Sequence, residues 1–302
     1  MTTVTRETPA RPADAPAAPR RDRNVRWGRD HRLPARTLII GALVLLALSS
    51  VFPLYFMAQA ALRTQAQWNS SELAFPTSLS FSTFKQVWLG GDVGLYLRNS
   101  TVITVGSTVL SLVVSTMAGF SFAKTRWRLS GVTYYFILSW LALPPVVLIV
   151  PIYIEMVELH LLNTYFSVIL LYTAFNIPFD TFLMTAFFRS LPDELVEAAR
   201  IDGASPHQVF RLVLVPLAKP ALGTLAIFNI LYAWNEFIFA LLLLNSSSVK
   251  TLTVGVLQLQ GRYTIDYPVI MAGLLVASIP VVAAYLFFQK FLVRGIVTGA
   301  VR

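Results

Sequence analysis

Six long apolar stretches constrain this chain more than any other feature. A membrane-spanning helix needs about 20 largely apolar residues. Four stretches carry no charged residue, and the other two carry one each, Asp180 and Glu236. Strands of a membrane barrel would instead alternate over about ten residues. The sequence therefore predicts an all-α membrane protein with six transmembrane helices over residues 37–62, 99–123, 129–154, 161–188, 220–244 and 267–289.

The composition excludes an ordinary soluble fold. Charged residues make up 13% of the chain and hydrophobic residues 56%, whereas an average soluble domain is roughly 25% charged. The chain contains no cysteine, which removes disulfides, thiolate catalysis and cysteine-based metal sites.

The net charge of +9 would suggest nucleic acid as the partner of a soluble protein. In a membrane protein it predicts topology, because Lys and Arg remain on the cytoplasmic side. With the N-terminus inside, 19 of the 24 Lys and Arg lie in inside segments and five in outside loops. We therefore expect both termini in the cytoplasm and no nucleic-acid partner.

Two terminal segments differ from the rest of the expected membrane domain, residues 37–302. Residues 1–36 contain nine arginines, five prolines and no apolar run, which predicts a disordered basic tail that touches membrane lipid. Residues 290–302 are expected to form a cytoplasmic C-terminal tail.

The second stretch predicts close helix packing. Ser107, Ser111, Ser115 and Gly119 recur every four residues, and a ridge of small residues lets helices approach closely in lipid. Prolines in or near several spans predict kinks. These prolines are consistent with ordinary variation in helix packing or with a bundle that moves around a translocation path.

A punctuated amphipathic loop, residues 190–216, separates the fourth and fifth stretches. Ser190 is the expected cap of a first helix, with Asp193 three residues on. Leu195, Ala198 and Ala199 share one face of that helix. Gly203 is expected to end it, because glycine readily takes positive φ.

A second helix is expected to begin at Ser205, with Gln208 completing a capping box. Pro216 is expected to stop it, and Pro220 to open the fifth span. The result is a helix–glycine–helix hairpin whose small, charge-balanced surface suits docking into a groove of another protein.

The same loop resembles the EAA loop of ABC-importer permeases: Glu-Ala-Ala, three residues, Gly, nine residues, Ile-x-Leu-Pro. Val213 and Val215 replace the usual Ile and Leu. Residues 176–179, 233–237 and 289–295 are similar to the carbohydrate branch of this family, specifically permeases like the G-type subunit of maltose systems. The matching residues of the EAA pattern are Glu197, Ala198, Ala199, Gly203 and Pro216.

The resemblance implies a permease subunit of a bacterial inner-membrane importer for a sugar or sugar-like solute. It implies a second permease subunit, two cytoplasmic ATPase subunits that bind ATP and Mg, and an extracytoplasmic solute-binding protein. No cofactor is expected on this chain. The residues implied to couple it to an ATPase are Glu197, Ala198, Ala199, Arg200, Asp202, Gly203 and Pro216.

Candidate residues for the substrate path lie near the intramembrane acid Glu236. A charge at the centre of a membrane helix faces protein or water, so Glu236 fits either a structural contact, which we favour, or a cavity lining. Asp180 is expected to have a structural or gate-side role. The path candidates are Asn176, Tyr232, Trp234, Asn235 and Glu236.

Two other functional classes compete with an importer subunit. An ion-coupled secondary transporter often shows internal repeats, and we find no clear repeat between the two halves. A membrane enzyme needs a nucleophile–base pair or a metal set, and neither an HExxH motif nor a phosphate loop occurs. We therefore expect no enzymatic activity and ATP hydrolysis on a partner. The outer loop 245–266 could reach a binding protein or simply connect two spans.

Overall fold

A computed structural model describes residues 33–71, 79–90, 92–125, 127–259 and 266–300. These residues form helices and no strand, which confirms the all-α prediction. The chain divides into two units, residues 1–52 and 53–302. The predicted tail lies outside the described residues up to residue 32, and its last four residues already belong to a helix.

The first unit contributes the start of helix α1 (Leu33–Ala61), which contains Pro53. From Thr37 to Phe52 every residue of this helix is exposed within the chain.

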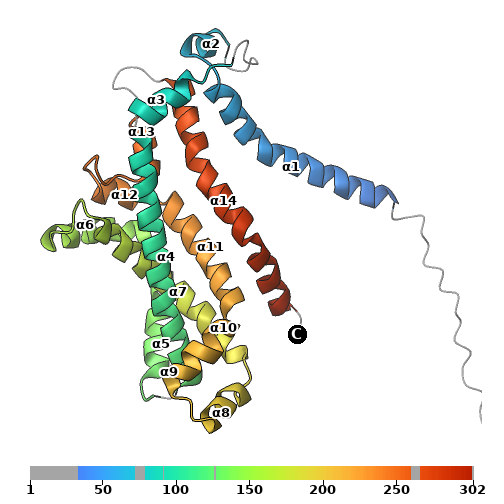
Figure 1. Cartoon of the computed structure of the whole chain (residues 1–302), viewed down its shortest axis with the longest axis vertical. Helices are drawn as coiled ribbons and strands as arrows, with labels where there is room; N and C mark the ends of the chain where they lie inside the picture. Colours follow the sequence, from blue (N-terminus) through green and yellow to red (C-terminus); the bar gives the residue numbers. More distant parts are fainter. Residues whose placement is uncertain (1–32, 72–78, 91, 126, 260–265, 301–302) are drawn as a thin grey trace, which may run out of the picture. The chain divides into compact units, whose positions relative to one another are not determined.

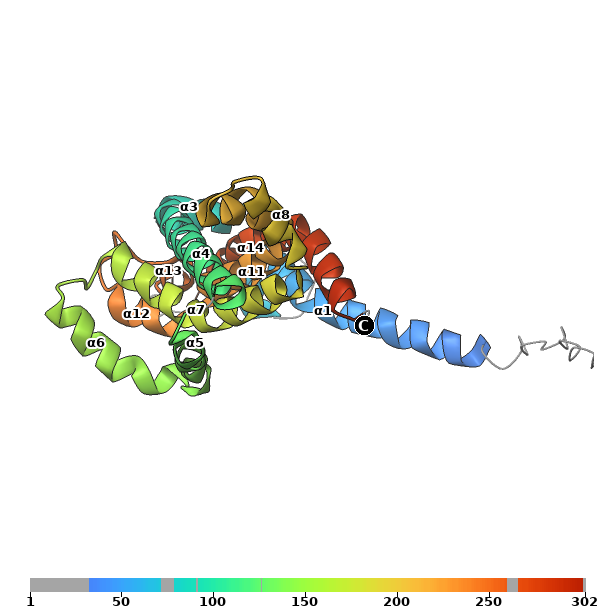
Figure 2. The same ribbon diagram turned by 90° about the horizontal axis from the view of Figure 1, so that it is seen from below.

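The second unit contains the remaining helices, shown in Figures 1 and 2. The long ones are α4 (Val93–Lys124), α7 (Tyr165–Ser190), α11 (Lys219–Asn235) and α14 (Tyr267–Ala300). The shorter ones are α2 (Gln65–Ser70), α3 (Ser82–Gly90), α5 (Ser130–Ser139), η1 (Trp140–Ala142), η2 (Pro145–Leu148), α6 (Ile149–Glu158), α8 (Glu194–Ile201), α9 (Pro206–Gln208), the π-helix η3 (Val209–Leu214), α10 (Val215–Leu217), α12 (Ile238–Leu243) and α13 (Leu252–Leu257).

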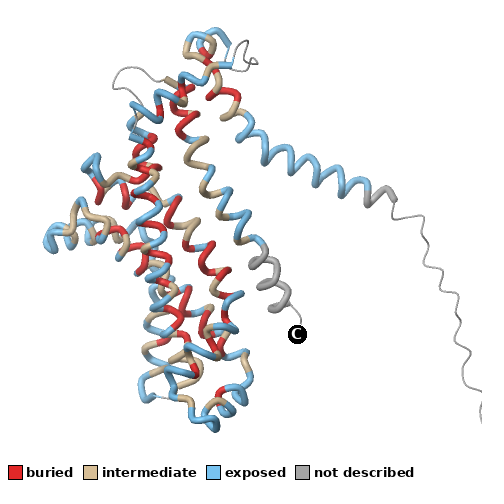
Figure 3. The backbone as a smooth tube through the Cα atoms, viewed as in Figure 1, coloured by how far each residue is buried: buried red, intermediate tan, exposed pale blue. Residues whose placement is uncertain are grey.

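The centre of this unit is the packed pair α4 and α7. The predicted ridge is confirmed: Ser107, Ser111, Ser115 and Gly119 are all buried. A Cβ atom on Gly119 would lie 2.7 Å from the Met184 Cβ of α7, so the backbones approach closely there. Buried residues follow α4, α7 and α11 in Figure 3.

The predicted spans are only partly continuous. Within the described residues, four helices are long and apolar enough to cross a membrane, and six spans result if each of two bent pairs is one span. The third stretch is bent by 94° between residues 142 and 145. Leu143 and Pro144 each precede a proline and are extended, with ψ of 118° and 126°, as the residue before proline prefers.

The fifth stretch is also interrupted. Helix α11 ends at Asn235, and α12 begins at Ile238. At the C-terminus, α14 continues through the expected tail to Ala300.

Candidate functional site

The loop after α7 begins differently from the prediction. Ser190 is the last residue of α7, and its hydroxyl donates to the Phe187 carbonyl at 2.7 Å. Asp193 occupies the N-cap of α8 and makes no capping hydrogen bond. The predicted cap at Ser190 is therefore wrong, because the preceding apolar helix continues further than the cap pattern implied.

The end of α8 confirms the prediction for Gly203. This residue has φ of +83°, in the region that favours glycine. Its amide donates to Arg200 O at 3.0 Å, and the Ala204 amide donates to Ala199 O at 3.0 Å. This pair of bonds is a Schellman motif, which satisfies the last carbonyls of α8.

The second helix starts as predicted and ends later. The Ser205 hydroxyl accepts from the Gln208 amide at 3.3 Å, and the Gln208 side chain accepts from the Ser205 amide at 2.8 Å. Pro216 lies inside the terminal turn α10 and does not stop the helix, which corrects the prediction. The π-helix η3 directly precedes this turn and ends at Leu214. Pro220 opens α11 as expected.

The hairpin lies at one end of the bundle, away from α2 and α3 (Figure 1). Val196 is buried beside Val209, Leu214 and the α7 residues Met184 and Phe188. Most predicted coupling residues face outward instead. Glu197, Ala198, Arg200, Asp202 and Gly203 are exposed, and Ala199 is half-buried.

The outer surface of α8 also carries two apolar side chains, Ile201 at 86% exposed and Leu195 at 39%. Sequence reasoning missed Ile201. Its signal was an isoleucine two residues before the capping glycine, outside the i, i+3, i+4 pattern. The exposed surface thus combines charges with an apolar contact, as protein interfaces do.

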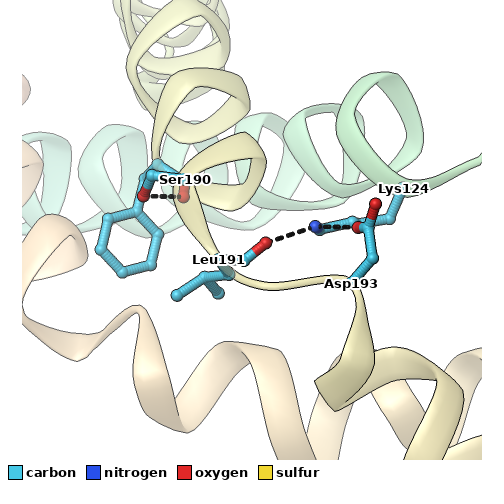
Figure 4. Close-up of polar contacts among 5 residues, drawn as sticks. Lys124, Ser190, Leu191 and Asp193 are labelled. Atoms are coloured by element: carbon cyan, nitrogen blue, oxygen red, sulfur yellow. Dashed lines mark hydrogen bonds and ion pairs between the residues drawn. The ribbon is translucent and has the colours of Figure 1, made fainter.

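A lysine that sequence analysis used only for topology anchors this hairpin. Lys124, the last residue of α4, donates to the Leu191 carbonyl at 2.7 Å and pairs with Asp193 Oδ1 at 2.5 Å (Figure 4). Its side chain is 5% exposed, whereas that of Asp193 is 78% exposed. A buried ammonium therefore holds an exposed carboxylate.

The second intramembrane acid, Glu236, provides hydrogen-bond acceptors for backbone amides that follow the break between α11 and α12. Its Oε2 accepts from the Tyr172 hydroxyl at 2.6 Å. Its carboxylate also accepts the backbone amides of Phe239 at 3.0 Å and Ala240 at 3.2 Å. Backbone groups freed inside a membrane need such partners. The geometry therefore supports the structural interpretation of Glu236.

The other path candidates make separate contacts. The Trp234 indole is 7% exposed and donates to the Ala277 carbonyl of α14 at 3.1 Å. It therefore contributes to packing, and its place on the substrate path stays a prediction. Asn235 is exposed, and its amide bonds to Leu231 O at 2.7 Å. Tyr232 is half-buried and packs edge-on against Tyr172. Asn176 is half-buried, and its buried Nδ2 has no hydrogen-bond partner among the described residues.

Asp180 joins three helices. It is fully buried, and its Oδ2 accepts from the Ser111 hydroxyl of α4 at 2.7 Å and from Asn229 Nδ2 of α11 at 2.6 Å. Its Oδ1 has no hydrogen-bond partner within the described part of the chain. The expected structural role of Asp180 therefore fits this arrangement.

The opposite end of the α4–α7 pair is tied to the outer loop. Asn99 of α4 accepts from the Tyr165 hydroxyl at 2.6 Å and donates to the carbonyls of Ser248 and Lys250 at 3.0 and 2.9 Å. The Ser100 hydroxyl accepts the Leu252 amide at 2.8 Å. The described part of loop 245–266 is thus fixed to the bundle, with residues 260–265 outside the description. Asn99 and Lys124 also show that α4 and α7 run in the same direction.

Comparison with known proteins identifies related chains. The family model described as "Binding-protein-dependent transport system inner membrane component" matches residues 111–298. A putative ABC transporter permease of Caldicellulosiruptor sp. (strain Rt8B.4) is 38% identical over 251 residues, which are 83% of this chain and 91% of that protein. The melibiose/raffinose/stachyose import permease of Bacillus subtilis (strain 168) is 31% identical over 85% of this chain and 94% of its own length.

A solved structure has the same fold. It is a bacterial ABC transporter involved in the import of the acidic polysaccharide alginate, and the likeness has a TM-score of 0.76. It covers 86% of this chain and 97% of that chain, at 23% sequence identity.

Proposed function

Because this chain belongs to the family of binding-protein-dependent transport system inner membrane components, and is a permease subunit of a carbohydrate ABC importer, we propose that loop 190–216 is where a cytoplasmic ATPase docks. The observation that carries this proposal is the exposed surface of α8. Glu197, Arg200 and Ile201 lie on a helix whose C-terminal end is fixed by a Schellman motif and whose inner face is buried against the bundle.

A rigid, capped helix suits force transmission. Val196 packs among buried side chains from α7, η3 and α11, so a displacement of α8 displaces the ends of those helices. A flexible segment of the same length would absorb the displacement by changing its backbone torsions. ATP and Mg bind the ATPase chains, whose closure supplies the movement.

We further propose the complete assembly and its orientation. The chain spans the membrane six times, with the bent pair over residues 130–158 as the third span and α11 with α12 as the fifth. Both termini lie in the cytoplasm, as the Lys and Arg distribution favours. A second permease chain, two ATPase chains and an extracytoplasmic solute-binding protein complete the importer. The substrate is an oligosaccharide, in line with the sugars named for the Bacillus subtilis relative.

Orientation can be tested with one labelling experiment, because the chain contains no cysteine. Ile201→Cys on α8 and Leu257→Cys on α13 each introduce one exposed thiol. We expect an impermeant maleimide to label the thiol at position 201 only from the cytoplasmic side and the thiol at position 257 only from outside. Labelling of both variants from the same side would refute the topology.

Docking is tested by protection and by co-purification. Co-expressed ATPase chains should protect the Ile201→Cys variant from the maleimide and leave the Leu257→Cys variant reactive. Glu197→Lys should reduce recovery of the ATPase with the permease. Glu158→Lys, at an exposed glutamate at the end of α6, is the matched control and should leave recovery unchanged. Equal recovery in both variants would contradict docking through α8.

A further inference from the structure

Helix α8 is connected to the central helices of the bundle in unequal ways. It follows α7 after three residues, Leu191, Pro192 and Asp193, and it continues through α9 and α10 into α11. Helix α4 has no such covalent link, because Lys124 precedes Asp193 by 69 residues. A movement of α8 therefore reaches α4 only through non-covalent contacts.

Lys124 provides a directional contact of this kind. Its Nζ lies 2.7 Å from Leu191 O and 2.5 Å from Asp193 Oδ1. Leu191 is the C-cap of α7 and Asp193 the N-cap of α8. One ammonium group thus connects the C-terminal ends of α4 and α7 with the start of α8, as Figure 4 shows.

The chemistry of the two acceptors favours this connection. The carbonyls at a helix C-terminus lack partners within the helix and carry partial negative charge, which attracts a cation. The Asp193 carboxylate makes no capping bond in α8 and is directed to Lys124 instead. Hydrogen bonds between ionised groups are shorter and stronger than neutral ones. The Lys124 side chain is buried, while the Asp193 side chain faces solvent.

A second cationic side chain, Arg189, extends from α7 to α4. Arg189 of α7 reaches the Phe122 carbonyl near the end of α4 at 3.5 Å, and its guanidinium lies 5.3 Å from the centre of the Tyr134 ring. These contacts connect α7 with α4 and α5. Lys124 differs from Arg189 because it also reaches the first residue of the docking hairpin, Asp193.

We propose that Lys124 is a positioning residue that makes α4 move together with α8 when the ATPases close. This inference rests on the proposed docking of an ATPase at α8. Apolar packing also joins the two regions, since Phe120 of α4 contacts the cluster around Val196. Such packing is non-directional, whereas the two Lys124 contacts join the end of α4 directly to the start of α8.

The test uses the complete importer, purified with its ATPase chains and supplied with its solute-binding protein. Lys124→Met keeps an unbranched side chain of similar length that suits a buried position, but it removes the charge and the donors. Lys124→Arg restores both. Lys219→Met is the matched control, because Lys219 is exposed on the same cytoplasmic hairpin connection.

We expect Lys124→Met to assemble normally and to hydrolyse ATP, while solute transported per ATP falls about two- to fivefold, the factor that corresponds to loss of an ion pair with a solvent-exposed partner. Lys124→Arg should recover most of this ratio. Lys219→Met should equal the unmodified importer. An unchanged ratio in Lys124→Met would overturn the inference, since a merely structural lysine would alter yield or melting temperature instead.

Movement itself is measured with spin labels at Met117→Cys on α4 and Glu194→Cys on α8, both exposed positions in a chain without cysteine. The distance between them should be the same in nucleotide-free and ATP-trapped importers, and should change on ATP trapping in Lys124→Met. A constant distance in Lys124→Met would overturn this inference but leave the proposed docking intact. Failure of the unmodified chain to bind any ATPase would overturn the proposed docking and this inference with it.

Discussion

The turn after α8 permits a prediction that separates backbone conformation from side-chain contact. Gly203 has φ of +83°, and a Cβ atom placed on it would meet nothing within 4 Å. A side chain at this position would not overlap other atoms of this chain, so the effect of a substitution comes from the strain of positive φ on the backbone. An L-residue in the left-handed region costs roughly 1–2 kcal/mol, which corresponds to a factor of about 5–30 in an equilibrium.

The expected order of variants follows from how readily each residue adopts positive φ. Gly203→Asn should stay near the unmodified level, because asparagine visits this region most readily. Gly203→Ala should lower substrate-stimulated ATPase activity about fivefold, and Gly203→Val by up to about thirtyfold. The assay compares stimulated and basal activity of the reconstituted importer. Gly131→Val, at an open glycine in α5, is the control for substitution near the same end of the bundle.

Two results would refute this reasoning. Normal coupling in Gly203→Val would show that the Schellman turn is not needed for transmission. If Gly203→Asn is as poor as Gly203→Val while Gly203→Ala is normal, the space beside residue 203 matters instead. The partner would then fill that space, and the backbone argument would be wrong.

Three further predictions concern the bundle, each measured by the melting temperature of the purified importer. Gly119→Ala should destabilise it by about 1–3 kcal/mol, because the new Cβ meets the Met184 Cβ and backbone atoms of α7 at 2.7–3.0 Å, whereas Gly131→Ala should be neutral or stabilise by up to about 1 kcal/mol; equal effects would contradict close packing of α4 on α7. Asp180→Leu should lower the free energy of unfolding by roughly 1–3 kcal/mol, because it leaves the buried Asn229 amide without its acceptor. Asp180→Asn keeps an acceptor and should cost less. The reverse order would contradict the role of Asp180 in joining three helices. Glu236→Gln should destabilise the importer more than Tyr172→Phe, because the carboxylate accepts hydrogen bonds from two backbone amides as well as from the tyrosine hydroxyl. Normal stability with lost uptake in Glu236→Gln would instead favour a substrate contact.

Local rules predicted the features that depend on one residue type and its neighbours. The ridge from Ser107 to Gly119, the positive φ of Gly203 and the capping box at Ser205 follow from short-range geometry. The prediction failed where two local rules compete. At Ser190 the apolar helix α7 continues to the residue that the cap pattern placed outside it, and at Pro216 the helical turn α10 continues to Leu217.

Tertiary pairing could not be predicted from single segments. Lys124 and Asp193 lie far apart in the chain, and nothing in either local sequence identifies the other as its partner. Trp234 and Glu236 belong to one motif, yet the indole bonds to α14 and the carboxylate to α7 and α12. The helical phase across the break at residues 236–237 separates them, and apolar periodicity does not reveal such a break.

The pairing of α4 and α7 determines where this permease can bend. The two helices are bonded at their N-terminal ends through Asn99 and Tyr165, close-packed at Gly119, and bonded at their C-terminal ends through Lys124 and Leu191. Together they form a rod that resists sliding or splaying, because any shear would break all three regions at once. We expect this pair to move as one body during transport. Its pivots are expected at the interruptions in the neighbouring spans, residues 143–145, 218 and 236–237.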